Sequence, residues 1–162
     1  MATCNHEADS DGPDAHTSSE RRDATPVESP DMHLERARRY IRAALDLVTG
    51  DEAAELLDLD ASASSPVLDD LRTTGQLIGF PTHNGAYLYP AFQFDTQRHK
   101  IYDVVRHANR RLYVNKDPYG AASWWLTPTE ILDGNSPLDD LAYGILTRVA
   151  VDNIVAAQRS GM

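Results

Sequence analysis

The chain has 162 residues, a net charge of −10 and an isoelectric point near 4.9. An excess of negative charge excludes general electrostatic attraction to nucleic acid. The single cysteine, Cys4, excludes an intramolecular disulfide and fits a reducing compartment. No apolar run reaches the ~18 residues of a membrane span, and the N-terminus lacks the basic-then-apolar order of a signal peptide. We therefore expect a cytoplasmic protein that does not associate with membranes.

Residues 1–31 are rich in Asp, Glu, Ser and Thr and contain almost no large apolar side chain. Such a segment cannot bury enough apolar surface to offset the entropy lost on ordering it. We predict a disordered acidic tail over residues 1–31, with the folded part starting near Met32.

Residues 32–95 carry signals for three helices followed by a hairpin. Apolar residues recur at helical spacing over His33–Val48, and Thr49-Gly50 is predicted to end that helix. A second helix is expected over residues 51–57, and Ser65-Pro66 is expected to open a third that reaches Thr74. The runs Gln76–Phe80 and Ala86–Tyr89 then flank an Asn84-Gly85 turn, which is a strong hairpin signal. This order predicts a winged helix-turn-helix-like domain over residues 32–95.

Residues 100–162 return to helical periodicity and are predicted to form a small helical domain. One helix is expected from Ile101 to Leu112, and Asp117-Pro118 should start a short helix that carries Trp124 and Trp125. Capping-box spacing is present at Thr127–Glu130 and, with Asp in place of Glu, at Ser136–Asp139. The last helix is predicted over about Ile145–Arg159, with its buried positions at Leu146, Val149, Ala150, Ile154 and Ala157. The expected fold class is therefore mainly α.

Motifs for catalysis and cofactor binding are absent from the sequence. There is no phosphate-binding glycine loop, no His-Glu-x-x-His, no Cys-x-x-Cys and no Gly-x-Ser-x-Gly. Because catalytic groups can be assembled from distant positions, this argues against an enzyme without excluding one. We expect no catalytic residue, no metal site and no cofactor.

The segment from Glu52 to Leu77 resembles the helix-turn-helix of MerR-type and excisionase-type regulators. That resemblance implies major-groove binding by the second helix of the motif, but this helix carries Asp69 and Asp70 with only one cation, Arg72. Two alternatives therefore remain: direct binding of operator DNA, or a fold retained as a scaffold or dimerisation element. The candidate DNA-binding residues are Arg36, Arg39 and Arg72.

The C-terminal third carries the most distinctive pattern. Its elements are Trp124-Trp125-Leu126-Thr127-Pro128, then Leu132-Asp133-Gly134-Asn135-Ser136-Pro137, then Leu141-Ala142-Tyr143-Gly144. This pattern resembles the toxin-binding domain of Xre/MbcA/ParS-type antitoxins, and the upstream Pro90-Ala91-Phe92-Gln93-Phe94 strengthens the resemblance. The likeness covers roughly residue 75 to the C-terminus.

The resemblance implies an antitoxin of a type II toxin-antitoxin system that acts as a homodimer and neutralises a RES-type, NAD-consuming toxin. The C-terminal helix would block the active site of the toxin. Of Trp124 and Trp125, either one is an exposed anchor or both lie in the core. The alternative function is a DNA-binding transcriptional regulator, including one that represses its own operon. The candidate toxin-binding residues are Trp124, Trp125, Arg148, Asn153, Gln158, Arg159 and Met162.

Overall fold

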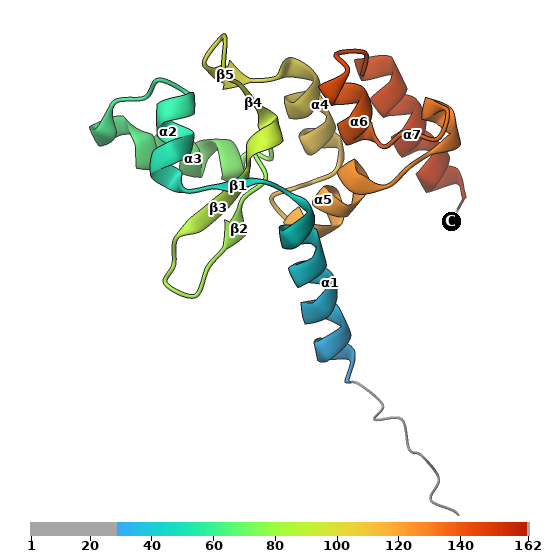
Figure 1. Cartoon of the computed structure of the whole chain (residues 1–162), viewed down its shortest axis with the longest axis horizontal. Helices are drawn as coiled ribbons and strands as arrows, with labels where there is room; N and C mark the ends of the chain where they lie inside the picture. The colour runs from blue at the N-terminus through green and yellow to red at the C-terminus, as the bar shows by residue number, and fades with distance from the viewer. Residues whose placement is uncertain (1–28, 162) are drawn as a thin grey trace, which may run out of the picture.

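Residues 29–161 are described by a computed structural model, and within them the chain is mainly helical, as predicted. Seven α-helices accompany a three-stranded antiparallel sheet and a separate two-stranded hairpin in this range (Figure 1). The predicted disordered tail lies outside the described residues up to residue 28. Its last residues, Pro30 and Asp31, belong instead to the first helix.

The N-terminal half has the element order helix, strand, helix, helix, strand, strand. These elements are α1 (Pro30–Ala44), β1 (Leu47–Val48), α2 (Gly50–Leu56), α3 (Ala61–Thr73), β2 (Phe80–Pro81) and β3 (Tyr87–Pro90). The strands form an antiparallel sheet in the order β1-β3-β2, with Phe80 opposite Leu88. The β2–β3 hairpin turns at Gly85, whose φ of +80° favours glycine. The structure thus has the predicted helix-turn-helix-like unit with a small hairpin wing.

The boundary between the first two helices differs from the prediction. Leu47 and Val48 do not continue α1 but form β1, because they pair with Pro90 and Tyr89 on β3. Thr49 does not end a helix; it caps the start of α2, accepting a hydrogen bond from the Glu52 amide at 3.2 Å. The Glu52 carboxylate accepts one from the Thr49 amide in return, which completes a capping box.

The start of α3 also differs from the prediction. This helix begins at Ala61, with Asp60 at the N-cap, so that Pro66 lies inside it. A proline in a helix interior removes one amide donor to the preceding turn and restricts the residue before it. The Ser65-Pro66 signal therefore indicated a helix correctly but placed its first residue too late.

The C-terminal half begins with an irregular connection and continues as four helices. The elements are a 3-10 turn (Ala91–Gln93), β4 (Phe94–Asp95), β5 (Lys100–Ile101), α4 (Asp103–Arg111), α5 (Pro118–Leu126), a second 3-10 turn (Glu130–Leu132), α6 (Pro137–Ala142) and α7 (Arg148–Ser160). Asp117 caps α5 and Ser136 forms a capping box with Asp139 at α6, both as predicted. Ile101 lies in β5 rather than at the start of α4.

Two predicted details of this half are wrong. The cap after α5 is Thr129, which accepts from the Ile131 amide, whereas the Thr127 hydroxyl donates back to the Ser123 carbonyl. The last helix begins at Arg148, and its buried positions are Val151, Ile154 and Val155. Val149 and Ala157, predicted to be buried, are exposed. Thr147 is the N-cap of this helix and accepts a hydrogen bond from the Ala150 amide.

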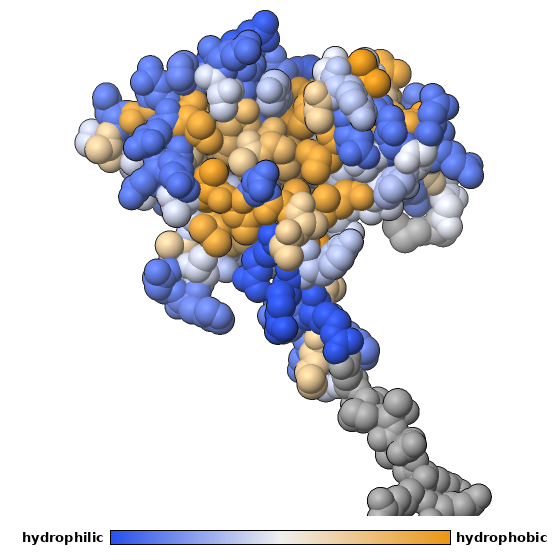
Figure 2. All heavy atoms as spheres, viewed as in Figure 1, coloured by the Kyte–Doolittle hydropathy of each residue, from blue (hydrophilic) through white to orange (hydrophobic). Residues whose placement is uncertain are grey.

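One cluster of buried residues spans both halves, from Ile41 on α1 to Val155 on α7. The predicted division into residues 32–95 and 100–162 therefore has a shared core at its boundary. Figure 2 shows a band of hydrophobic residues across the middle of the visible face, whereas α1 below it is largely hydrophilic. The C-terminal part of α1 packs on α5, and the N-terminal part projects from the body (Figure 1).

Candidate protein-docking surface

Large hydrophobic side chains are exposed where α6 passes into α7. Tyr143 is 71% exposed, Ile145 60% and Val149 68%. Asn153 follows Val149 by four residues on α7, so the two lie on the same side of the helix, and Asn153 is also exposed. We call the surface formed by Tyr143, Ile145, Val149 and Asn153 the α6–α7 face. Several large apolar side chains exposed within one short segment are typical of a surface that contacts a partner.

The loop between the two helices holds Ile145 outward. Gly144 has a φ of +72°, a left-handed conformation that glycine adopts without strain. The amides of Ile145 and Leu146 both donate to the Asp140 carbonyl, at 3.0 and 3.2 Å. Leu146 is buried while its neighbour Ile145 is not, so the backbone conformation itself places the isoleucine on the surface.

The opposite side of α7 is fixed to α4. Val151, Ile154 and Val155 are buried, and the two helices pack against each other. Asp152 lies 2.9 Å from Nε2 of His107 and 3.2 Å from Nε of Arg111. The α6–α7 face therefore lies on a helix that is held in position by packing on α4 and by the contacts of Asp152.

The two tryptophans are both buried, which corrects the hypothesis that one of them is an exposed anchor. Trp125 is fully buried and Trp124 is 6% exposed; their rings meet edge to face at 5.1 Å. Trp125 donates from Nε1 to Oδ1 of Asn109 at 3.1 Å. Trp124 Nε1 has no hydrogen-bond partner within residues 29–161. Both indoles therefore belong to the hydrophobic core, and the two sides of α5 that carry them are buried.

Asn109 belongs to a buried polar network that sequence reasoning missed. Its Nδ2 donates to the Gln76 carbonyl and to Oε1 of Gln93, both at 3.0 Å. Gln93 Oε1 also accepts from the Ile78 amide, and its Nε2 donates to the Ile78 and Pro90 carbonyls. The only sequence signals were a glutamine between two phenylalanines and an asparagine beside the apolar positions of α4.

Four other predicted toxin-binding residues lie on α7 and are exposed: Arg148, Asn153, Gln158 and Arg159. Arg148 is the first residue of α7, and Asn153 is on the α6–α7 face. Gln158 lines a shallow depression beside Trp124, and Arg159 donates from Nη2 to the Arg111 carbonyl at 3.3 Å. Met162 lies outside the described residues. The structure thus places Asn153 on the same side of α7 as the exposed Val149, whereas Gln158 and Arg159 lie farther along the same helix.

The three candidate DNA-binding arginines do not converge. Arg36 and Arg39 are exposed on α1, whereas Arg72 lies near the C-terminal end of α3. The Arg72 side chain is only 17% exposed, pairs with Asp69 at 3.1 Å and stacks over the Tyr87 ring at 3.6 Å. Arg72 therefore already has protein partners on both sides of its guanidinium group.

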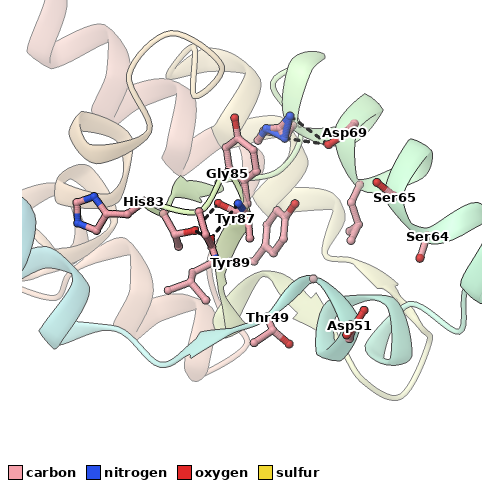
Figure 3. Close-up of a pocket in the computed structure, with 16 residues that line it drawn as sticks. Thr49, Asp51, Ser64, Ser65, Asp69, His83, Gly85, Tyr87 and Tyr89 are labelled. Atoms are coloured by element: carbon pink, nitrogen blue, oxygen red, sulfur yellow. Dashed lines mark hydrogen bonds and ion pairs between the residues drawn. The ribbon is translucent and has the colours of Figure 1, made fainter.

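An open groove of about 870 Å³ lies between α3, the start of α2 and the hairpin wing (Figure 3). Tyr87 and Tyr89 from β3 line one side, and burial raises the pKa of the Tyr89 hydroxyl. Asp51 and Asp69 contribute carboxylates and Arg72 is the one arginine of the lining. This groove lies between α3 and the hairpin wing, and the two carboxylates of its lining oppose the binding of DNA phosphates there.

Comparison with known proteins gave no match: no family model, no curated protein sequence and no solved structure is similar to this chain. The described residues contain no group of three or more His, Cys, Asp or Glu side chains that could hold a metal ion. None of the helices within residues 29–161 is long and apolar enough to span a membrane.

Proposed function

We propose that this chain is a cytoplasmic antitoxin that binds and neutralises a RES-type, NAD-consuming toxin through the α6–α7 face. The observation that carries the proposal is the exposure of Tyr143, Ile145 and Val149 within seven residues of one another. The pattern that resembles antitoxin toxin-binding domains ends in this same segment. The partner chemistry that fits the face is an apolar protein surface with polar groups at its edge.

The exposed end of α7 supports a mechanism by which the toxin would be neutralised. All residues from Ala156 to Gly161 are exposed, and the contacts of Arg159 with Arg111 and the Tyr113 ring are weak ones. A last helical turn with so little burial is available to enter a concave site on a partner. We propose that it occludes the NAD pocket of the toxin while the α6–α7 face provides the affinity.

The test is co-expression with a RES-domain toxin, followed by co-purification and an assay of NAD consumption. Val149→Arg places a charge at the centre of the apolar contact, so we expect recovery of the complex to fall at least about tenfold. Ala86→Arg, which adds the same charge on the exposed hairpin tip, should leave recovery unchanged. Equal recovery with both variants would rule out the α6–α7 face.

A shortened chain separates binding from occlusion. Deletion of residues 156–162 keeps the buried Val151, Ile154 and Val155. We expect this variant to co-purify with the toxin while NAD consumption resumes. Full inhibition by the shortened chain would refute occlusion by the end of α7 but not binding by the α6–α7 face.

A second candidate function is a DNA-binding regulator, and the winged-helix element order favours it. Because Arg72 is paired and stacked, the contacts are better sought on α1. If the chain shifts its own upstream DNA, Arg39→Ala should weaken that binding more than Arg72→Ala does. A larger loss from Arg72→Ala would show that α3 is the DNA-binding helix.

We also propose that two copies associate through α1. Met32, Leu34 and Tyr40 are all at least half exposed on this projecting helix. Leu34→Arg should convert a dimer into a monomer in light scattering coupled to size-exclusion chromatography. A monomeric parent chain, or a dimer that the substitution does not affect, would contradict this assignment.

A further inference from the structure

A small cleft between α4 and the start of α7 is lined only by ionisable side chains. Its volume is about 180 Å³, and the lining consists of Asp103, Arg106, His107, Arg110 and Arg148. With His107 neutral the lining carries a net charge of +2, in a chain whose total is −10. Three arginines around one small cleft are not expected in a chain with this excess of acidic residues.

The arginines of the cleft lack carboxylate partners. Arg106 donates from Nε to Oε1 of the buried Gln76 at 2.9 Å, so its orientation is fixed by a neutral group. Arg110 and Arg148 are exposed, and neither has a carboxylate oxygen within 4.0 Å in the described part of the chain. Asp103 is the one carboxylate of the lining, so the three guanidinium groups leave an excess of positive charge in the cleft.

Asp103 in the lining and Asp152 beside His107 each have a basic partner already. Asp103 accepts from Nζ of Lys100 at 3.2 Å, and Asp152 is shared by His107 and Arg111. The Lys100 ammonium, with smaller contributions from Arg106 and Arg148, holds the pKa of Asp103 below its ordinary value. The lining of the cleft therefore carries more positive than negative charge.

The position of Arg148 adds to the unfavourable charge. As the first residue of the thirteen-residue helix α7, it lies at the positive end of the helix dipole, where a cation is disfavoured. The neighbouring arginines of α4 raise this local repulsion further. A bound anion reduces both the repulsion between Arg148 and the helix dipole and the repulsion among the arginines, since helix amino ends and arginines both attract negative charge.

We propose that the Arg106–Arg110–Arg148 cleft is a binding site for a phosphate group. Planar guanidinium groups bind phosphate oxygens in pairs, and a multiply charged anion matches the net charge of the lining better than a single carboxylate does. Arg106, oriented by Gln76, provides the fixed donor, and Arg110 and Arg148 close on the anion from α4 and α7. The cleft is too small for an extended ligand, so it holds the phosphate group while the rest of the ligand stays outside.

The experiment is titration of the purified full-length chain with inorganic pyrophosphate by calorimetry at low ionic strength, where such contacts are least screened. We expect saturable binding that Arg110→Ala and Arg148→Gln each weaken by about tenfold or more. Arg98→Ala removes an exposed arginine outside the cleft and should change the affinity by less than about twofold. Absence of binding, or equal losses in all three variants, would overturn the proposal. Circular dichroism melting confirms that each variant is folded.

A parallel titration with a short DNA duplex identifies the source of the phosphate. One outcome is that the duplex binds, that pyrophosphate displaces it, and that Arg110→Ala weakens its binding. In that case the cleft binds the phosphates of a nucleic-acid backbone. If pyrophosphate binds and the duplex does not, the ligand is a free phosphate compound. A duplex that binds equally to the parent chain and to Arg110→Ala, without any pyrophosphate binding, would refute the site.

This site does not depend on the antitoxin proposal, because its test uses the chain alone. Arg148 borders both surfaces, but Arg110 belongs only to the cleft. Arg110→Ala should weaken phosphate binding by about tenfold or more and leave toxin co-purification intact. Val149→Arg should leave phosphate binding intact and reduce toxin co-purification. The two proposals can therefore fail separately.

Discussion

Asn109 joins the two halves of the molecule at the scale of a single side chain. It is fully buried on α4, accepts a hydrogen bond from Trp125 on α5, and donates to Gln76 and Gln93 from the N-terminal half. Each partner is itself buried, so no water can replace a lost bond without a rearrangement of the core. Buried polar groups that lose a partner are among the most destabilising changes in proteins.

We predict that Asn109→Ala lowers the free energy of unfolding by about 3 kcal/mol. The substitution removes the hydrogen-bond partner of Trp125 Nε1 and of the Gln76 carbonyl, and it also creates a small cavity. Urea unfolding followed by tryptophan fluorescence measures the loss. The matched control is Asn153→Ala on the surface of α7, which should change stability by no more than about 0.5 kcal/mol. A loss below about 1 kcal/mol for Asn109→Ala would show that the network contributes little.

Asp139 makes stability depend on pH at the start of α6. Hydrogen bonds from the Ser136 amide and hydroxyl hold the pKa of this carboxyl below its ordinary value of 3.8. A carboxyl with a lowered pKa in the folded state stabilises the fold above its unfolded pKa, and that contribution is lost as the pH falls through the folded value. Between pH 7 and pH 3, the melting temperature of Asp139→Asn should therefore fall less than that of the parent chain. Parallel curves for the two proteins would contradict this role.

At the scale of elements, Pro66 is the least favourable residue of α3. It cannot donate to the carbonyl of the preceding turn, although the helix runs through it from Ala61 to Thr73. We predict that Pro66→Ala raises the free energy of unfolding by about 1–2 kcal/mol, since the gain in helix propensity exceeds the extra entropy of the unfolded chain. Chemical denaturation measures the difference. Pro118→Ala, at the first position of α5 where no amide bond is lost, should give no such gain.

The elements that were predictable from the sequence are those fixed by local chemistry. Asp117-Pro118 and Ser136-Pro137 mark the starts of α5 and α6 correctly, because cap and proline lie within one turn of the helix they begin. Leu47-Val48 was assigned to a helix because its strand partner, Tyr89-Pro90, is more than forty residues away. Tertiary pairing overrides local periodicity in such a segment.

The candidate site was only partly predictable for a related reason. Arg148 and Asn153 were identified on the last helix, but Val149 was assigned to the core, because either of two adjacent apolar faces could have been the buried one. The cap by Thr147 and packing on α4 select Val151 and Val155 instead. The arginine cleft combines residues about forty positions apart, from α4 and α7, and no local sequence pattern reveals such a cluster.

At the scale of the whole molecule, the shared core bears on how the chain unfolds. Aromatic contacts cross the predicted domain boundary: Phe80 stacks on Tyr119 with ring centroids 4.5 Å apart, and Phe92 meets Trp125 at 5.1 Å. The Asn109 network crosses it as well. Boundaries between independent domains are normally crossed by few contacts, and here buried side chains from both sides depend on each other.

We therefore predict that the folded part unfolds in a single cooperative transition, with equal calorimetric and van't Hoff enthalpies. Separate fragments covering residues 29–99 and 100–162 should show no cooperative melting, because each would expose one side of the shared core to water. Asn109→Ala should lower one common melting temperature, whether it is followed by tryptophan fluorescence from α5 or by far-ultraviolet circular dichroism from all helices. Two separate transitions, with only the later one shifted by Asn109→Ala, would instead establish two domains that fold independently and would place the docking surface on a self-sufficient C-terminal module.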